Sequence, residues 1–407
     1  MWNALKTVWT NRDIRIVTLT MFCLGFTFAS AWPYQSLIAL DQLHFSPRGF
    51  AAVLISVAVI GMIGNVVIGH FSDLAANRKQ AILAALAAGA FGFGLFALLP
   101  SKATFLFCML VVVPISTSSY GQLFAVIRTI TAQDPTEAAS VNSAVRAVYA
   151  ASWIVVPGLV GAWIAYRQNV SDSYGIAGMA YLFCFLLYAA FGPSGGRPST
   201  QTTQRLRSLI EALRLVAARP IFIRIVALAL IGMAHPLNAA VLPLLIEGPL
   251  QGTTRDIGLL AGLVAGLEIP FMLLAGSACR RMPTYVVVAI GGLTYAAYAL
   301  GLSQATALWH VYALSVIGAA GAAVILSLFL SYLQDLMPDR PGLGTSLISI
   351  EGVLARAGSA ATFALIGIWT SLAGALLIGG LAGVVGVALL VLLETRGTPV
   401  EGLPKAA

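Results

Sequence analysis

The chain has 407 residues, of which 59% are hydrophobic and 9% are charged, and its formal net charge is +8. A soluble domain carries about 25% charged residues, so these few charges cannot build a water-soluble surface at this length. The composition therefore excludes soluble enzymes and indicates an integral membrane protein with the lipid bilayer as its solvent. We expect no nucleic-acid partner, because in a membrane protein a positive net charge usually resides in cytoplasmic loops.

Continuous apolar runs predict membrane-spanning helices, because the strands of a membrane barrel alternate apolar and polar residues. A spanning helix needs about 20 apolar residues, so twelve of them use about 240. We predict an all-α membrane protein with twelve transmembrane helices. The predicted spans are 16–38, 50–70, 80–99, 104–127, 139–165, 174–192, 221–246, 257–278, 284–303, 308–333, 345–369 and 372–393.

The distribution of Lys and Arg predicts the orientation of these spans. With the N-terminus inside, sixteen of these residues fall on the inner side and four on the outer side, while three lie in or at the edge of spans. Both termini are therefore expected in the cytoplasm.

A polar stretch at residues 193–220, rich in Pro, Ser, Thr and Arg, separates residues 1–192 from residues 221–407. We predict that it is a cytoplasmic linker between two six-helix halves. Within it, Arg205–Ala217 could form an amphipathic helix on the inner face of the membrane.

The two halves resemble each other in three short segments that occur in the same order. The matched pairs are Trp32–Gln35 with His235–Asn238, Ser46–Phe50 with Thr254–Gly258, and Gly161–Trp163 with Gly367–Trp369. The first pair is offset by 203 residues and the last by 206. This pattern predicts a parallel 6+6 repeat, in which substrates bind at the interface of the repeats.

Four charged side chains lie inside predicted spans, where each costs about 2.5–3.5 kcal/mol on insertion scales. They are Arg146, Glu268, Glu351 and Arg356. Helix rise places Arg146 about 10 Å and Glu268 about 15 Å from the cytoplasmic ends of their spans, so the two could pair across the halves. Such a pair would be either a gate or proton site, or a static contact needed for assembly. Glu351 and Arg356 are poorly spaced to pair with each other, and Asn65 is a candidate partner for Glu351.

Polar and aromatic side chains near the middle of the spans are candidates to line a substrate cavity. They are Trp32, Tyr34, Gln35, Tyr120, Gln122, Asn142, Tyr149, Trp153, His235 and Asn238. Each could instead mark a membrane interface or bridge two helices. Gln35 and Asn238 are favoured because both follow a proline at matching positions of the repeat. His235 could titrate, although a lone histidine is more often a neutral hydrogen-bonding group.

Motifs for cofactors and metals are absent from the sequence. There is no HExxH, no CxxC pair among the four cysteines, and no lysine that follows a glycine as in a Walker A loop. We therefore expect no cofactor, no metal ion and no enzymatic activity.

The spans, the linker and the repeat together resemble the major facilitator superfamily. The signature of its second loop is a glycine, three residues, an aspartate and then basic residues, and it is similar to Gly69 and Asp73 followed by Arg78 and Lys79. The resemblance implies that the aspartate caps span 11 and locks the cytoplasmic side. Pro157–Gly161 resembles the antiporter motif of the family, in which glycines permit close helix packing.

Within this superfamily, the chain resembles the bacterial sugar efflux transporters. The segments that carry this resemblance are Gln122–Ala125 with Arg128, Ser143–Ala147, Ala265–Pro270, Leu274–Gly276, and Gln334–Pro338 with Arg340. The resemblance implies export of small sugars or glycosides across the bacterial inner membrane by a monomer. The coupling ion would be the proton, exchanged by antiport with alternating access. Glu268 is the first choice for the coupling carboxylate.

Two alternatives stay open. Efflux of drugs or other metabolites uses the same fold, and a cavity lined mainly by Phe, Leu and Met would favour it. A membrane-embedded enzyme or a sensor would need a catalytic constellation or an added soluble domain, and the sequence contains neither.

Overall fold

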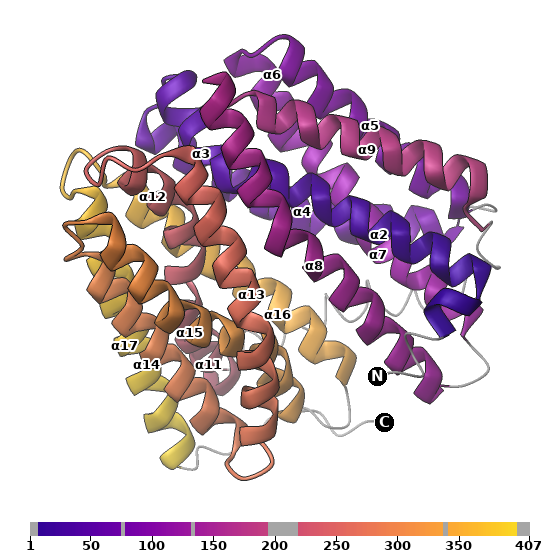
Figure 1. The fold of residues 1–407 in the computed structure, drawn as a ribbon. Coiled ribbons are helices and arrows are strands. Elements are labelled where there is room, and N and C mark those ends of the chain that lie inside the picture. Colours follow the sequence, from indigo (N-terminus) through magenta and orange to yellow (C-terminus); the bar gives the residue numbers. More distant parts are fainter. Residues whose placement is uncertain (1–6, 75–77, 132–134, 194–218, 337–340, 397–407) are drawn as a thin grey trace. The chain divides into compact units, whose positions relative to one another are not determined.

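The computed structural model describes residues 7–74, 78–131, 135–193, 219–336 and 341–396 (Figure 1). These residues form helices, with one isolated β-bridge between Ile366 and Thr370. The helices up to the linker are α2 (Arg12–Ala31), η1 (Trp32–Tyr34), α3 (Gln35–Leu37), η2 (Ile38–Gln42), α4 (Pro47–Leu74), α5 (Arg78–Leu98), α6 (Lys102–Phe107), η3 (Cys108–Val112), α7 (Val113–Ile130), α8 (Pro135–Arg167) and α9 (Asp172–Phe191). Those after it are α11 (Arg219–Gly232), α12 (Ala234–Glu247), α13 (Thr254–Ala278), α14 (Thr284–Leu302), α15 (Leu308–Asp335), α16 (Pro341–Ala364) and α17 (Leu372–Thr395).

Eleven segments of the described residues are long and apolar enough to cross a membrane. They match every predicted span except 345–369. That region is helical as well, in α16, but it is less apolar because it carries Glu351 and Arg356 among several glycines and hydroxyl residues. The predicted all-helical membrane class is confirmed.

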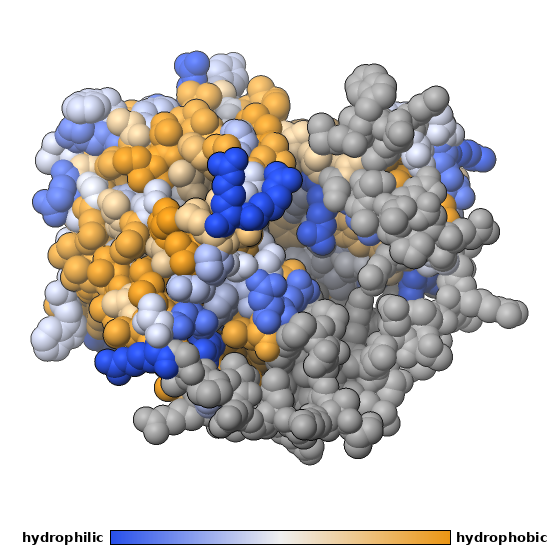
Figure 2. Space-filling model, turned by 90° about the horizontal axis from the view of Figure 1, so that it is seen from below, coloured by the Kyte–Doolittle hydropathy of each residue, from blue (hydrophilic) through white to orange (hydrophobic). Residues whose placement is uncertain are grey.

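Large apolar side chains stand on the outside of the molecule. Trp369, Leu98, Leu273 and Met179 are 83%, 82%, 73% and 73% exposed. Figure 2 shows hydrophobic residues covering broad areas of one face, with hydrophilic residues in separate groups. Apolar exposure on this scale suits contact with lipid tails rather than with water.

The first span of each half is broken at the same place of the repeat, although the sequence predicted two continuous helices. Helix α2 ends at Ala31 and gives way to a 3₁₀ turn that contains Pro33, and α11 ends at Gly232, just before α12 and Pro236. Proline has no N–H and its ring clashes with the carbonyl four residues earlier, so a continuous helix is disfavoured at both positions.

The chain folds as two compact units. The first unit comprises Met1–His44, Val59–Thr203 and Thr253–Gly262, and the second comprises Phe45–Ala58, Gln204–Gly252 and Leu263–Ala407. The predicted linker and its amphipathic helix lie almost entirely outside the described residues. The predicted boundaries between the halves therefore stay a prediction.

Glycines let helices approach closely inside each unit. In the first unit, a Cβ at Gly89 on α5 would stand 2.6 Å from the ring of Tyr181 on α9. In the second unit, a Cβ at Gly318 on α15 would stand 2.9 Å from the ring of Tyr298 on α14. Small residues at such interfaces allow the close packing that associates helices within a membrane.

The start of α13 packs against α8 within the first unit. The hydroxyl of Thr254 donates a 3.1 Å hydrogen bond to the carbonyl of Gly161. A Cβ at Gly258 would collide with the carbonyl oxygen of Pro157. The close packing that the family resemblance implied for Pro157–Gly161 is therefore present, and its partner is the beginning of α13.

Candidate functional site

One face of α8 carries most of the polar and aromatic candidates of the first unit. Asn142, Arg146, Tyr149 and Trp153 follow one another at intervals of four, three and four residues. Because helical neighbours at these intervals share a face, the four side chains form one stripe along an otherwise apolar helix. Arg146 is exposed and the other three are partly buried. We call this set the α8 stripe.

Aromatic rings of α7 lie against the α8 stripe. The ring of Tyr120 is 5.0 Å from that of Phe124 and 5.0 Å from that of Tyr149, both edge to face. The guanidinium carbon of Arg146 lies 5.2 Å from the centre of the Phe124 ring, which is a cation–π contact. Phe124 was not among the predicted site residues. The spacing of four between two aromatic residues, Tyr120 and Phe124, is the signal that could have found it.

Two amide oxygens in this region have no hydrogen-bond donor among the described residues. They are the buried Oδ1 of Asn142 on α8 and the buried Oε1 of Gln122 on α7. The amide nitrogen of Gln122 donates to the hydroxyl of Ser118 at 3.1 Å, so its orientation is fixed. Buried acceptors are normally satisfied, and two open acceptors are therefore suited to bind hydroxyl groups of a ligand.

The broken end of α2 borders a small hollow of about 10 Å³ in the first unit. Its lining is Phe28, Ala31, Trp32, Gln35, Phe93, Met109, Val113 and Tyr174. The sulfur of Met109 accepts hydrogen bonds from the amide of Gln35 at 3.5 Å and from the hydroxyl of Tyr174 at 3.6 Å. Trp32 is 41% exposed, whereas Gln35 is buried. The hollow is mostly apolar, and one amide provides its polarity.

Tyr34 takes a different position from its two predicted neighbours. Its side chain is fully buried, and its hydroxyl donates a 2.7 Å hydrogen bond to the carbonyl of Pro157 on α8. This arrangement joins the broken end of α2 to α8.

His235 and Asn238 at the start of α12 meet two tyrosines of α14 in the second unit. The ring of His235 lies 5.8 Å from that of Tyr295, and the hydroxyl of Tyr298 donates to Oδ1 of Asn238 at 3.4 Å. The amides that follow the two prolines thus have similar surroundings, since Gln35 also reaches a tyrosine through Met109. Neither tyrosine of α14 was among the predicted site residues, although their spacing of three in an apolar helix was visible.

Glu351 on α16 is buried beside the break between α11 and α12. A Cβ at Gly232 would stand 2.8 Å from its Oε1 atom. Arg356, one and a half turns further along α16, is exposed and reaches back to the carbonyl of Gly352 at 3.5 Å. The proposed partner Asn65 has a side chain outside the described residues, so that pairing stays a prediction.

Glu268 is partly buried in α13, a helix that passes from the first unit to the second after Gly262. It belongs to the second unit, whereas Arg146 belongs to the first. The predicted pairing of Arg146 with Glu268 therefore stays a prediction.

Of the signature of the second loop, the structure describes the side chains of Arg78 and Lys79. The surroundings of Gly69 and of the Asp73 side chain lie outside the described residues, and the predicted cap on span 11 stays a prediction. Arg78 is buried, and the ammonium group of Lys79 donates to the carbonyl of Gly192 at 2.9 Å. Gly192 caps the C-terminus of α9, where a cation is favourable because of the helix dipole.

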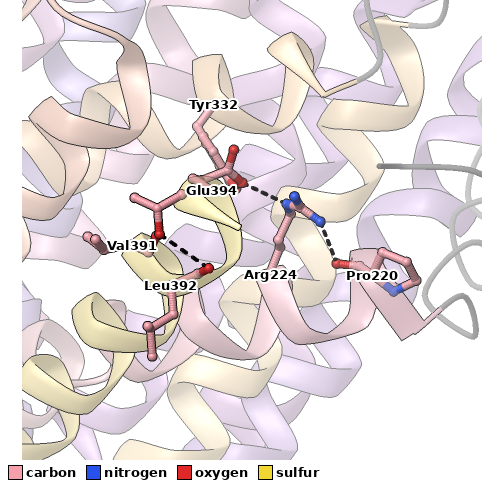
Figure 3. A network of polar contacts seen from close by, with 7 residues as sticks. Pro220, Arg224, Tyr332, Val391, Leu392 and Glu394 are labelled. Atoms are coloured by element: carbon pink, nitrogen blue, oxygen red, sulfur yellow. Dashed lines mark hydrogen bonds and ion pairs between the residues drawn. The ribbon is translucent and has the colours of Figure 1, made fainter. Parts of the chain in front are cut away.

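A buried ion pair of the second unit was not predicted from the sequence (Figure 3). The Nε atom of Arg224 on α11 lies 2.7 Å from Oε1 of Glu394 on α17. The hydroxyl of Tyr332 on α15 donates to the same oxygen at 2.7 Å, and Arg224 also donates to the carbonyl of Pro220 at 3.1 Å. We call these three side chains the α11–α15–α17 cluster. Among the described residues, no group of three or more His, Cys, Asp or Glu could hold a metal ion.

Comparison with known proteins identifies relatives of this architecture. Residues 17–360 match the pattern of the Major Facilitator Superfamily. The chain is 28% identical to a sugar efflux transporter homologue of Deinococcus radiodurans, over 88% of this chain and 91% of that protein. It is 26% identical to sugar efflux transporter A of Dickeya chrysanthemi and 25% identical to sugar efflux transporter C of Escherichia coli, in each case over 81% of this chain and 82% of the relative.

Solved structures share the fold at low sequence identity. The nucleoside transporter NupG superposes with a TM-score of 0.74 at 12% identity and covers 96% of this chain and 100% of its own. A peptide transporter of the POT family superposes with a TM-score of 0.76 at 13% identity and covers 94% of both chains. The family pattern covers most of the chain and the neighbours share its helical fold, so this chain belongs to the major facilitator superfamily and is a membrane transporter rather than an enzyme.

Proposed function

We propose that the chain exports small sugars or glycosides across the bacterial inner membrane, by proton antiport with alternating access. Both termini would lie in the cytoplasm, and a monomer would suffice. The names of the relatives support the substrate class. Proton coupling is supported by carboxyl groups within the spans, because a buried carboxyl can gain and lose a proton as its surroundings change.

The observation that carries the substrate class is the α8 stripe with the rings of α7. A sugar carries hydroxyl groups around its edge, and its apolar faces can stack on an aromatic ring. The stripe offers both counterparts, since Tyr149 and Trp153 have flat rings and the guanidinium of Arg146 has N–H groups that can donate to hydroxyls. The open acceptor of Asn142 lies on the same helix face. A site of this kind would orient hydroxyls with few polar groups and hold the ring on aromatic surfaces.

The experiment is uptake of labelled lactose into inside-out membrane vesicles, with and without an imposed proton gradient. Uptake that depends on the gradient and is absent from vesicles lacking the protein would support the proposal. If the protein is present and folded but takes up no lactose or other sugar of a small panel, sugar export is wrong.

Efflux of drugs or other apolar metabolites is the second candidate, and the apolar side chains around the small hollow beside α2 favour it. That hollow is lined by Phe28, Phe93 and Met109, and Gln35 provides an amide. Competition of an apolar cation with lactose, or transport of the cation alone, would distinguish this function from sugar export.

A further inference from the structure

Glu351 and Gly232 depend on each other for their positions. Glu351 is 5% exposed, and its Oε1 atom lies 2.8 Å from the point where a Cβ at residue 232 would stand. A ring carbon of Phe329 on α15 lies 3.3 Å from the same point. A side chain at residue 232 would therefore displace the carboxyl group. The glycine places a carboxyl oxygen directly against the last residue of α11.

The backbone at this place lacks a hydrogen-bond donor. In a continuous helix, the carbonyl of Gly232 would accept from the N–H four residues later, but that residue is Pro236, which has no N–H. Met233 and Leu237 on either side of the break still use the carbonyls of Ala229 and Met233. A protonated carboxyl next to Gly232 can supply the missing donor, whereas a carboxylate is an acceptor only.

The other half of the repeat fills the corresponding places with apolar residues. With the offset of 203 the counterpart of Gly232 is Ala29, and with the offset of 206 the counterpart of Glu351 is Val145. Both are fully buried in the first unit. Packing at this point of the fold therefore does not require a carboxyl group or a glycine. Only the second unit has them, next to its broken helix.

In the part of the chain that the structure describes, few charged or titratable groups face Glu351. Arg356 of its own helix acts electrostatically on both Glu351 and His235. Among the helices packed against α16, α12 contributes His235. At their shared end, α11, α15 and α17 bring together Arg224, Tyr332 and Glu394, which bind one another, and Asp335 of α15 accepts from Thr284. Among the described residues, Glu351 is therefore left with an exposed arginine of its own helix and the backbone at the break.

We propose that Glu351 binds and releases a proton, and that its protonated form closes the break between α11 and α12 by donating a hydrogen bond to the carbonyl of Gly232. The proton comes from water and returns to water. Loss of the proton converts the donor into a carboxylate that repels the carbonyl oxygen, so the break opens. This inference rests on the proposed proton-coupled function, because it names Glu351 as a positioning residue for that coupling, in addition to Glu268.

The first test needs no substrate. Hydrogen–deuterium exchange of residues 229–240 is measured in the purified full-length protein from about pH 5 to about pH 8 and corrected for intrinsic exchange rates. We expect opening of the break to rise by roughly tenfold with pH in the wild type, the change that one ordinary hydrogen bond supplies. In Glu351→Gln, whose amide can donate at every pH, we expect slow exchange that does not depend on pH. Glu268→Gln is the matched control, and its break should keep the wild-type pH dependence.

Exchange that does not depend on pH in the wild type, or wild-type pH dependence in Glu351→Gln, would overturn the inference.

The second test uses sugar transport in vesicles. Gradient-driven accumulation of sugar by Glu351→Gln should be roughly tenfold lower than that of the wild type. The variant should still exchange labelled for unlabelled sugar, because this exchange moves no net proton. Loss of both activities would show a structural role only. If the wild type transports no sugar but its break responds to pH through Glu351, the proposed function fails while the proton-dependent break stands.

Discussion

The hydroxyl of Tyr34 donates a 2.7 Å hydrogen bond to the carbonyl oxygen of Pro157. The tyrosine follows the broken end of α2, and the proline lies inside α8, where close packing against α13 begins. A Cβ at Gly258 would also stand 2.7 Å from this hydroxyl oxygen. One buried hydroxyl therefore joins two helices at the point where a third packs against them.

Replacement of Tyr34 by phenylalanine removes this hydrogen bond and leaves the carbonyl with one interaction fewer. We expect a loss of about 1 kcal/mol in the free energy of unfolding, the usual net value of one hydrogen bond. Thermal unfolding of the detergent-solubilised protein measures the effect. Tyr166→Phe on α8 is the matched control, because Tyr166 is 81% exposed. Equal melting temperatures for the two variants would contradict the prediction.

Introduction of a methyl group at Gly258 should be far more harmful than at Gly61. A Cβ at Gly258 meets the carbonyl of Pro157, whereas a Cβ at Gly61 meets nothing within 4 Å. Overpacking of this kind costs about 1–3 kcal/mol, so Gly258→Ala should lower the melting temperature and Gly61→Ala should not. Size-exclusion chromatography after graded heating compares the two. A stable Gly258→Ala would show that α8 and α13 can separate without cost.

The ion pair between Arg224 and Glu394 should show strong coupling in a double-mutant cycle. Arg224→Gln or Glu394→Gln alone leaves a charge without its partner in a poorly hydrated place, which costs about 3–5 kcal/mol. The double variant should be less destabilised than the sum of the single variants, because neither charge is then left alone. Thermal unfolding of the four proteins gives the coupling. Additive effects would mean that the 2.7 Å contact contributes nothing to stability.

Arg146→Lys should weaken sugar transport although it preserves the charge. The planar guanidinium lies over the ring of Phe124, and an ammonium group cannot reproduce both this stacking and paired hydrogen bonds to hydroxyls. We expect the apparent affinity for sugar to fall by roughly tenfold, which corresponds to about 1.4 kcal/mol. Concentration-dependent uptake in vesicles measures it. Arg167→Lys, at the exposed end of α8, serves as the control and should transport like the wild type.

Much of the fold could be predicted from the sequence because the bilayer restricts it. Apolar runs predicted the helices to within a few residues in most cases, as in Leu372–Thr395. The breaks at Pro33 and Pro236 were visible as prolines in matched segments. Their effect was missed, because neighbouring helices often restore the hydrogen bonds that a proline removes and allow a membrane helix to continue.

The site could be predicted as residue types but not as contacts. The α8 stripe follows from helical spacing, and its four members were all candidates. The ion pair of Arg224 with Glu394 joins residues 170 positions apart, and no local pattern predicts which helices meet. Glu351 was recognised as a charge within a span, but its contact with Gly232 depends on how α16 packs against α11. Tertiary packing decides these pairings.

Each compact unit also contains a short stretch from the other side of the linker. Thr253–Gly262 belongs to the first unit, and Phe45–Ala58 belongs to the second. A gene divided within the linker would therefore encode two polypeptides, neither of which could complete its own unit. We expect each fragment to be degraded when produced alone and both to persist when produced together. Degradation of unpaired fragments would thus select for fragments that complete each other's units, because only such pairs would persist in the cell.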